Sequence, residues 1–242
     1  MTKKKPKVPP LPPARPFGRR VLGWLVRGVL GVAAFYLALI VLFSFLTPPG
    51  NIYQWQESWR LGGIEREWVN IGDIAPDMAR SVVAAEDANF CLHWGFDMAA
   101  IRDAIDSGGG RGRGASTISQ QVVKNVFLWQ NRSWMRKAME AALTPVVELI
   151  WSKQRIVEMY LNQAEFAEGV FGVQAAARHY WDIDARDLTP TQAARLAAVL
   201  PNPKDYNASN PGPYVKNRAR QIIAGAETIR VDGRADCFEV KD

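Results

Sequence analysis

A long apolar run near the N-terminus stands apart from the mixed pattern of the rest of the chain. Positions 28–46 contain no charged residue, and a helix of that length spans a bilayer with little tilt. A cleaved signal peptide is the alternative, but the run is long for one and no small-residue cleavage pattern precedes Thr47. The pattern predicts an uncleaved anchor. The excess of Lys and Arg before it predicts a cytoplasmic N-terminus, with the remainder of the chain outside.

Beyond Pro76 the apolar positions recur at helical spacing. Region 54–70 shows no clear period, so we expect irregular or short β-like structure there. No alternating stretch is long enough for a large sheet, and the predicted fold class is therefore mostly α. The capping and stop signals place the expected helices at 76–88, at 98–106 after the cap residue Asp97, at 117–128, at 134–161 with an interruption near Pro145, and at 189–200.

One carboxylate conflicts with this pattern. Met78 and Val82 lie one above the other on the apolar face of the first of these helices, and Glu86 is the next residue in the stripe. A carboxylate there would be partly desolvated, which raises its pKa and suits proton transfer. Conflicts of this kind tend to mark functional sites. The alternative is an acidic helix end that is paired with a nearby Lys or Arg.

The net charge of +6 is concentrated at the start of the chain. Eight Lys and Arg precede the first acidic residue, Glu57; removing them from the 30 basic residues leaves 22, against 24 acidic ones. The basic character therefore belongs to the tail and predicts no nucleic-acid partner. Its Lys- and Pro-rich composition predicts a disordered tail at 1–20, followed by the anchor at 21–47 and a folded domain at 48–235.

The cysteines and histidines give only weak signals. Cys91 and Cys237 are the only cysteines in the sequence. A disulfide and two unpaired thiols both remain open for them. No cluster of His and Cys indicates a zinc site. His93 lies in an apolar neighbourhood, and we interpret it as a structural hydrogen-bonding residue rather than as a base.

A glycine-rich loop precedes the helix at 117–128. The run from Ser107 to Gly114 is neither a dinucleotide fingerprint nor a P-loop, because no strand precedes it and the Gly-Lys-Ser/Thr ending is missing. We expect a flexible loop that carries the guanidinium groups of Arg111 and Arg113.

The helix at 117–128 has a polar face. Helical spacing puts Thr117, Gln121 and Lys124 on this face, with Asn125 adjacent. Such a face suits an anionic or sugar ligand, whereas the common alternative is an ordinary solvated helix surface.

Cations and a second carboxylate follow this helix. Arg132, Arg136 and Lys137 precede Glu140, and the spacing of Arg136 and Glu140 also fits a simple helical ion pair. Two carboxylates with cations between them suit transfer of a group away from a phosphate leaving group. One carboxylate would take a proton while the cations hold the developing negative charge.

An apolar and aromatic stretch from Val126 to Met135 lies between the polar face and these cations. It includes Phe127, Leu128, Trp129 and Trp134. We expect part of it to dip into the membrane interface, and core packing is the alternative.

Five segments of the sequence resemble the motifs of the family 51 glycosyltransferases, the peptidoglycan glycosyltransferases. They occur in the family's order and close to its spacing. Gln192 and Ile183 depart from residues that are frequent in the family, but both lie outside the predicted chemistry. The matching segments are EDANFCLHWGFD at 86–97, GASTISQQVVKN at 114–125, RKAME at 136–140, SKQRIVEMYLN at 152–162, and the stretch 172–203 that begins GVQAAARHYW.

The resemblance implies a lysozyme-like, mostly α-helical glycosyltransferase domain with a small membrane-proximal jaw lobe. Because no transpeptidase domain follows, the chain resembles the single-domain, monofunctional members of Gram-negative bacteria. Such an enzyme would polymerise lipid II into β-1,4 glycan strands at the inner membrane, with its domain in the periplasm, and would release undecaprenyl diphosphate. The implied partners are lipid II, the growing glycan strand, membrane lipid, and proteins of cell-wall synthesis or division.

The resemblance also assigns roles to residues. Glu86 would be the general base on the acceptor 4-hydroxyl, and the α-linked donor would give a β bond by inversion. Glu140 would be the second catalytic carboxylate and would organise the diphosphate with Lys124, Arg132, Arg136 and Lys137. No cofactor would be required, although Mg²⁺ or Mn²⁺ could assist at the diphosphate. The other residues implied in substrate binding are Asp87, Phe90, His93, Gly114, Ser116, Thr117, Gln120, Gln121 and Asn125.

Two other functions compete with this one. A lytic enzyme on the same kind of fold would also use a Glu, but it would need no cluster of cations for a diphosphate. An inactive, membrane-anchored cell-wall scaffold would be expected to lack Glu86, and both carboxylates are present.

Overall fold

The computed structural model describes residues 17–106 and 116–240, with side chains from Val21 onward. The predicted disorder at 1–16 and of the loop that contains Gly114, Arg111 and Arg113 falls outside these ranges, whereas residues 17–20, also predicted as disordered, are helical. The chain divides after Leu39 into two compact units. The first is, as far as it is described, part of the helix α1 (Phe17–Phe45), whose residues Val21–Phe45 are long and apolar enough to cross a membrane. This agrees with the predicted anchor.

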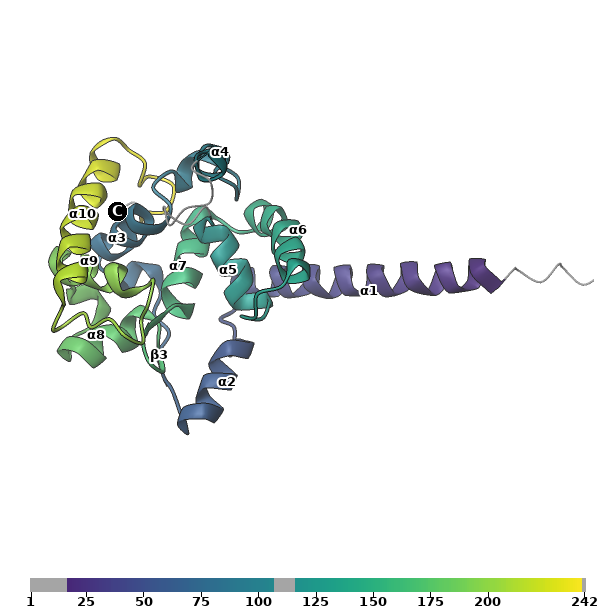
Figure 1. Cartoon of the computed structure of the whole chain (residues 1–242), viewed down its shortest axis with the longest axis horizontal. Coiled ribbons are helices and arrows are strands. Elements are labelled where there is room, and N and C mark those ends of the chain that lie inside the picture. The colour runs from purple at the N-terminus through teal and green to yellow at the C-terminus, as the bar shows by residue number, and fades with distance from the viewer. Residues whose placement is uncertain (1–16, 107–115, 241–242) are drawn as a thin grey trace, which may run out of the picture. The chain divides into compact units, whose positions relative to one another are not determined.

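The second unit is mostly helical, as predicted, and carries a small three-stranded sheet (Figure 1). In the sheet, the order is β1-β3-β2, with β1 parallel and β2 antiparallel to β3. Its elements are α2 (Ile52–Leu61), β1 (Glu65–Arg66), α3 (Pro76–Glu86), α4 (Met98–Asp106), α5 (Ile118–Phe127), α6 (Trp134–Ile150), α7 (Lys153–Gln163), β2 (Glu165–Ala167), β3 (Val170–Phe171), α8 (Val173–Trp181), α9 (Pro190–Val199) and α10 (Pro213–Val231).

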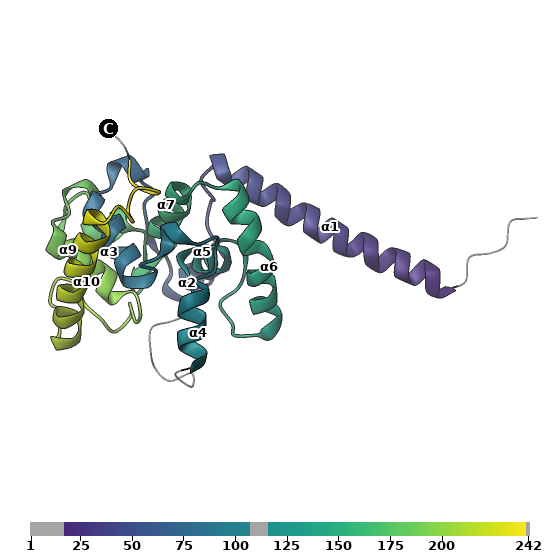
Figure 2. The ribbon, with the colours of Figure 1, turned by 90° about the horizontal axis from the view of Figure 1, so that it is seen from above.

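Two groups of packed helices form the body of this unit. In one group, α3 packs against both α9 and α10. In the other, α5 packs against α6 and α7 (Figures 1 and 2). Large side chains fill the core, and Phe90, Phe166, Phe171 and Phe238 are almost completely buried. The last residue of α3 and the first turns of α5 therefore come from different helix groups.

Helix starts follow the polar residues that the sequence offers. Thr117 accepts a hydrogen bond from the backbone N–H of Gln120, and the Gln120 side chain accepts one from the N–H of Thr117. This is the predicted capping box, and it satisfies two N–H groups that the helix leaves open. Asp97 likewise caps α4, because its Oδ1 accepts from the N–H groups of Ala99 and Ala100.

One expectation about secondary structure is wrong in part and another is wrong. In the region 54–70, residues up to Leu61 belong to α2, because Asn51 and Gln54 build a capping box at its start, whereas the short strand β1 (Glu65–Arg66) agrees with the expectation. The helix α6 runs through Pro145 and ends only at Ile150. Pro145 is exposed, so its ring faces away from the core; the chain breaks instead where Ser152 caps the start of α7.

The apolar stretch after α5 is divided between core and surface. Phe127 and Leu128 are buried, and the Phe127 ring packs against those of Phe43 and Trp151 at 6.1 and 5.9 Å. The membrane-interface expectation is therefore wrong for these two residues, because aromatic neighbours cover them. Trp134 is exposed over 80% of its surface and remains available to the interface.

The end of α1 belongs to the second unit and is fastened to it. Trp151 donates from Nε1 to the carbonyl oxygen of Ile40 at 2.7 Å. Arg155 donates to the carbonyl oxygens of Phe43 and Leu46 at 3.0 and 2.8 Å. Phe43 lies in the last turn of α1, where helix carbonyls lack intrahelical partners, and Leu46 follows the helix end. The Arg155 side chain supplies a partner to both carbonyls, and Trp151 adds a bond to the carbonyl of Ile40 inside the helix.

Candidate active site

Glu86 ends α3 at the edge of the core. Met78 and Val82, which precede it on the stripe, are fully buried, and Glu86 itself is partly buried, as the pattern predicted. Gln121 on α5 donates from Nε2 to Glu86 Oε2 at 2.9 Å, and the Tyr160 hydroxyl on α7 donates to Gln121 Oε1 at 3.3 Å. Three helices thus orient one carboxylate through a single amide.

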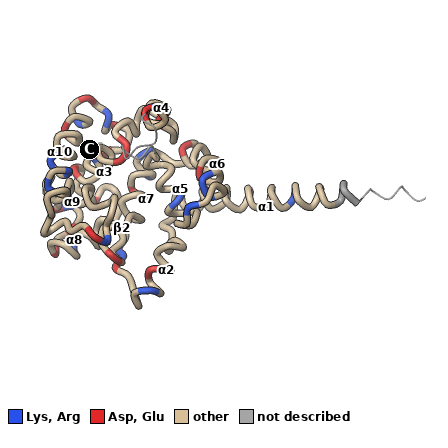
Figure 3. The backbone as a smooth tube through the Cα atoms, in the orientation of Figure 1, with Lys and Arg blue, Asp and Glu red and all other residues tan. Residues whose placement is uncertain are grey.

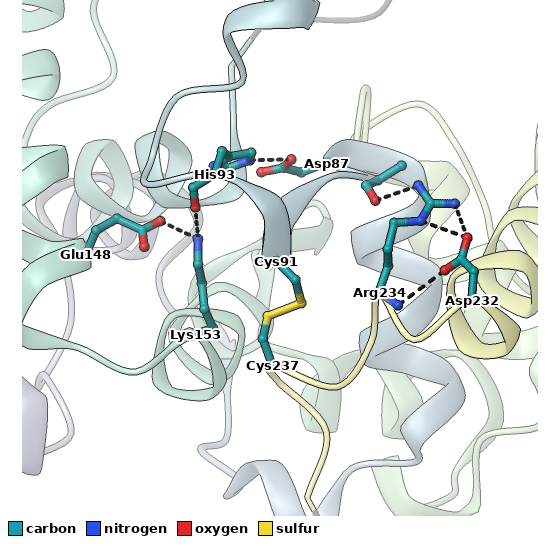
Figure 4. The surroundings of a disulfide bond; sticks show 9 residues. Asp87, Cys91, His93, Glu148, Lys153, Asp232, Arg234 and Cys237 are labelled. Carbon is teal, nitrogen blue, oxygen red and sulfur yellow. Dashed lines mark hydrogen bonds and ion pairs between the residues drawn. A yellow bond between two sulfur atoms is a disulfide. The ribbon is translucent and has the colours of Figure 1, made fainter.

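The residue after Glu86 fixes the start of α5. Asp87 is buried, and its Oδ2 accepts from the backbone N–H of Ile118 at 3.0 Å. Its Oδ1 lies 2.9 Å from His93 Nε2 (Figure 4). The N–H of Gly95 donates to His93 Nδ1, so the imidazole proton is on Nε2 and is donated to Asp87. This arrangement agrees with the structural role that we inferred for His93.

A cavity of about 730 Å³ lies between α5 and the start of α6. Four cations line it against one carboxylate, and Figure 3 marks the basic residues on both helices. A surplus of positive charge at such short range favours a polyanionic ligand. Its lining residues are Ser116, Gln120, Gln121, Lys124, Gln130, Arg132, Ser133, Trp134, Arg136, Lys137 and Glu140.

Glu140 is the buried acidic centre of this cavity, with 2% of its surface exposed. Arg136 Nη1 donates to its Oε2 at 2.7 Å, and Lys137 pairs with its Oε1. The helical ion pair predicted from the sequence is therefore present. Because both carboxylate oxygens are already paired with cations, and the described residues hold no cluster of three acidic, His or Cys side chains, the donor set does not fit a resident metal ion.

The ammonium group of Lys124 interacts electrostatically with both carboxylates, Glu86 and Glu140. Burial lowers its pKa below the ordinary value of 10.5, while Glu140 and Glu86 both act in the opposite direction. Its half-buried ammonium therefore lies within the field of both acidic groups.

A second, smaller cavity of about 280 Å³ shares Gln121, Lys124 and Gln130 with the first. Amide and aromatic side chains dominate its walls, a mixture that suits hydroxyl and acyl groups of a sugar. Gln163 is buried in its wall, and its Nε2 has no hydrogen-bond partner among the described residues. The other lining residues are Asn51, Tyr53, Asn125, Tyr160, Ala164, Glu165, Phe171, Leu200 and Pro203.

Nine of the predicted site residues line these cavities; Glu86, Asp87, Phe90, His93 and Thr117 do not, and Gly114 is outside the described residues. Glu86 is joined to the cavity wall by its hydrogen bond with Gln121, Thr117 caps α5, and Asp87 binds His93 and the start of α5. Phe90 is completely buried, with Lys153 Nζ 4.2 Å from its ring centre, so the structure places it in the core. A substrate contact for these six residues stays a prediction. Sequence reasoning missed Tyr160, although it stands in the fourth motif, and it had no signal for Gln130 or Gln163. It named Trp134 only as a candidate for the membrane interface and not as a residue of the site.

The site offers a carboxylate that can accept a proton next to a cavity that can bind an anion. Glu86 accepts a neutral hydrogen bond from Gln121 and has no cationic hydrogen-bond partner among the described residues, whereas both carboxylate oxygens of Glu140 are paired with cations. The first carboxylate is thus the one free to accept a proton, and the second fixes the positions of Arg136 and Lys137.

Comparison with known proteins identifies the family of this chain. Residues 55–227 match the family model described as Transglycosylase. The chain is 59% identical over 225 residues to the biosynthetic peptidoglycan transglycosylase of Jannaschia sp. (strain CCS1), covering 93% of each chain. It is 49% identical to that of Xanthomonas campestris pv. campestris (strain B100), covering 90% of this chain and 92% of the relative. For the protein of Pseudomonas entomophila (strain L48) the identity is 47%, with coverage of 82% and 87%.

Proposed function

Because this chain belongs to the transglycosylase family and is a peptidoglycan glycosyltransferase, we propose that it polymerises lipid II into linear β-1,4 glycan strands, with release of undecaprenyl diphosphate. One observation carries the proposal. Glu86, a carboxylate with no cationic hydrogen-bond partner among the described residues, and a cavity lined by four cations share the side chain of Gln121.

The proposed reaction uses these groups in one displacement. Glu86 accepts the proton of the acceptor 4-hydroxyl as the oxygen forms a bond with the donor's anomeric carbon. The bond from that carbon to the diphosphate oxygen breaks, and its electron pair leaves with the diphosphate. Attack opposite an α-linked leaving group gives the β product. Lys124 and the guanidinium groups of Arg132 and Arg136 stabilise the charge that develops on the diphosphate.

The charge of the larger cavity favours this function over a lytic one. Cleavage of a glycan strand by a Glu-dependent hydrolase produces no diphosphate and has no use for four clustered cations. The apolar segment Val21–Phe45 supports a membrane location, which would confine the enzyme to the surface that holds a lipid-linked substrate. We propose that the tail is cytoplasmic and the domain periplasmic, at the inner membrane.

The test is polymer formation from lipid II by purified variants. Glu86→Gln keeps the size of the side chain but cannot take the proton, so turnover should fall on the order of a hundred- to ten-thousand-fold. Glu227→Gln, at an exposed ion pair on α10, is the matched control and should polymerise normally. Near-normal turnover by folded Glu86→Gln would show that another group is the base. Glycan fragments instead of polymer from the wild type would show that the enzyme is lytic.

A further inference from the structure

The backbone around Glu86 is held from one side by the C-terminal part of the chain. Cys91 and Cys237, left open by the sequence, form a disulfide that joins residues separated by 146 positions (Figure 4). Cys237 belongs to residues 232–240, which follow α10 and which we call the C-terminal segment. The disulfide therefore links this segment to the stretch that begins at the proposed base.

Two guanidinium groups bind carbonyl oxygens on either side of Glu86. Arg218 on α10 donates from Nη2 to the carbonyl oxygen of Ala85 at 2.9 Å. Arg234 in the C-terminal segment donates from Nη1 to that of Ala88 at 3.1 Å. Asp232 accepts from Arg234 Nε at 2.9 Å and thereby orients it. Backbone groups just before and just after the carboxylate are fixed by the same region of the chain.

Apolar contact reinforces this attachment. Phe238 is almost completely buried, and its ring centre lies 6.3 Å from that of Phe90, one residue before Cys91. On α3 itself, Arg80 Nε lies 3.3 Å from Glu239 Oε1. The C-terminal segment thus contacts both the helix that ends at Glu86 and the turn that follows it.

On its other side, the turn that follows Glu86 is bonded to α5, the helix that lines both cavities. Asp87 binds the N–H of Ile118 at the start of α5, and α5 presents Gln121 to Glu86 and Lys124 to both cavities. A shift of the turn would therefore move the base and its partner helix relative to each other. Misplacement by about 1 Å is enough to cost on the order of a hundredfold in rate.

We propose that the C-terminal segment is a positioning element of the catalytic site, and that Cys91, Cys237 and Arg234 act on the reaction by fixing the turn that carries Glu86. The proposal rests on the proposed function of Glu86 as the base. It differs from a purely stabilising role, which would protect the fold without affecting the turnover of molecules that are folded.

The experiment compares two variants that remove contacts between the C-terminal segment and the turn with a matched control. These two lesion variants are the double variant Cys91→Ser/Cys237→Ser and the single variant Arg234→Gln. The control is Arg230→Gln, which removes another arginine of this region, one that is ion-paired with Glu227 on α10. Each full-length protein is assayed for lipid II polymerisation well below its melting temperature, and kcat and KM are determined separately.

We expect kcat to fall about tenfold in each lesion, with KM within about twofold of the wild type and no change in the control. Arg234→Lys, which keeps a cationic donor, should recover part of the loss. Treating the wild type with a dithiol, which becomes a cyclic disulfide as the two cysteines become thiols, should lower kcat to the level of the double Ser variant. Hydrogen exchange at 85–91 should accelerate in the lesions and not in the control.

Unchanged kcat in folded Arg234→Gln and in the folded double variant would overturn the proposal, even if both melt earlier. If the double variant does not fold, Arg234→Gln and its Lys counterpart decide the matter. Failure of the proposed function would look different, because the wild type would then make no polymer or Glu86→Gln would remain active.

Discussion

Replacing Glu140 with glutamine would test the role of the second carboxylate, because it removes one buried charge and keeps the side-chain volume. The glutamine can accept a hydrogen bond from one of the two cations, but its NH₂ group would then face the other. Arg136 would keep its bond from Nε to the carbonyl oxygen of Asn131 at 3.1 Å. The substitution therefore weakens the interactions of Arg136 and Lys137 at this position but does not remove all of them.

The structure sets the size of the expected effect. Glu140 and Arg136 are both buried and lie 2.7 Å apart, and a hydrogen bond to a charged group contributes about 1.5–3 kcal/mol. The Lys137 side chain is half exposed, so its pair adds only about 0–1 kcal/mol. We expect the free energy of unfolding to fall by about 2 kcal/mol, which lowers Tm by about 4–8 °C for a domain of this size.

Activity should fall less than it does without the base. Glu140 orients cations but takes no proton in the proposed reaction, so kcat/KM should drop on the order of tenfold. Glu158→Gln on α7 is a suitable control, because Glu158 is similarly buried, pairs with Arg155 and accepts from the N–H of Ile71 at 3.0 Å. It should lose comparable stability and keep its turnover.

The assays are thermal melting and polymer formation from lipid II, both measured on the same preparations. Two results would refute the reasoning. An unchanged Tm for Glu140→Gln would show that the pair with Arg136 does not stabilise the cavity. A loss of turnover as large as that of Glu86→Gln, in a folded protein, would show that Glu140 takes part in the proton transfer.

Three further predictions concern pH, the membrane and topology. Burial lowers the pKa of Lys124, so kcat/KM should decline at alkaline pH as its proton is lost, and Lys124→Arg should move that decline to higher pH; an unmoved profile would exclude Lys124. Between its folded pKa and 10.5 the unfolded state binds more protons, so the Lys124 contribution to stability should rise with pH there. Trp134→Ser with Leu149→Ser, both at exposed positions, should weaken liposome binding of an anchor-deleted protein without a change in Tm, and unchanged binding would contradict an interfacial role. A reporter that is active only in the periplasm should work when fused after Asp242; a silent reporter there would reverse the topology.

Local pattern predicted the elements that build the site. The stripe of Met78 and Val82 identified Glu86 as a conflict, and the structure shows both apolar residues buried with Glu86 at the helix end. The spacing of Arg136 and Glu140 predicted the ion pair that forms. These predictions succeeded because each depends on residues within one or two helical turns, where spacing fixes which side chains meet.

Features that depend on distant residues could not be predicted. The Cys91–Cys237 pairing joins parts of the chain that no local rule relates. Phe127 is buried because Phe43 and Trp151 cover it, and neither is its neighbour in the sequence. Gln163 lies in a cavity wall where its Oε1 accepts from Asn51 Nδ2, at the start of a helix 112 residues earlier in the sequence.

Gly95 shows how a residue without a side chain can hold this site together. Its φ of +87° is strained for other residues, and a Cβ there would lie 2.5 Å from Thr144 Cγ2 on α6. Its N–H binds His93, and its carbonyl oxygen accepts from the Thr117 hydroxyl that caps α5. The positive φ and the close approach to α6 therefore require glycine at this position. Together with the two backbone hydrogen bonds, they bring the helix of Glu140, the helix of Gln121 and the turn after Glu86 to one point, so the first motif contributes through its backbone as well as through its carboxylate.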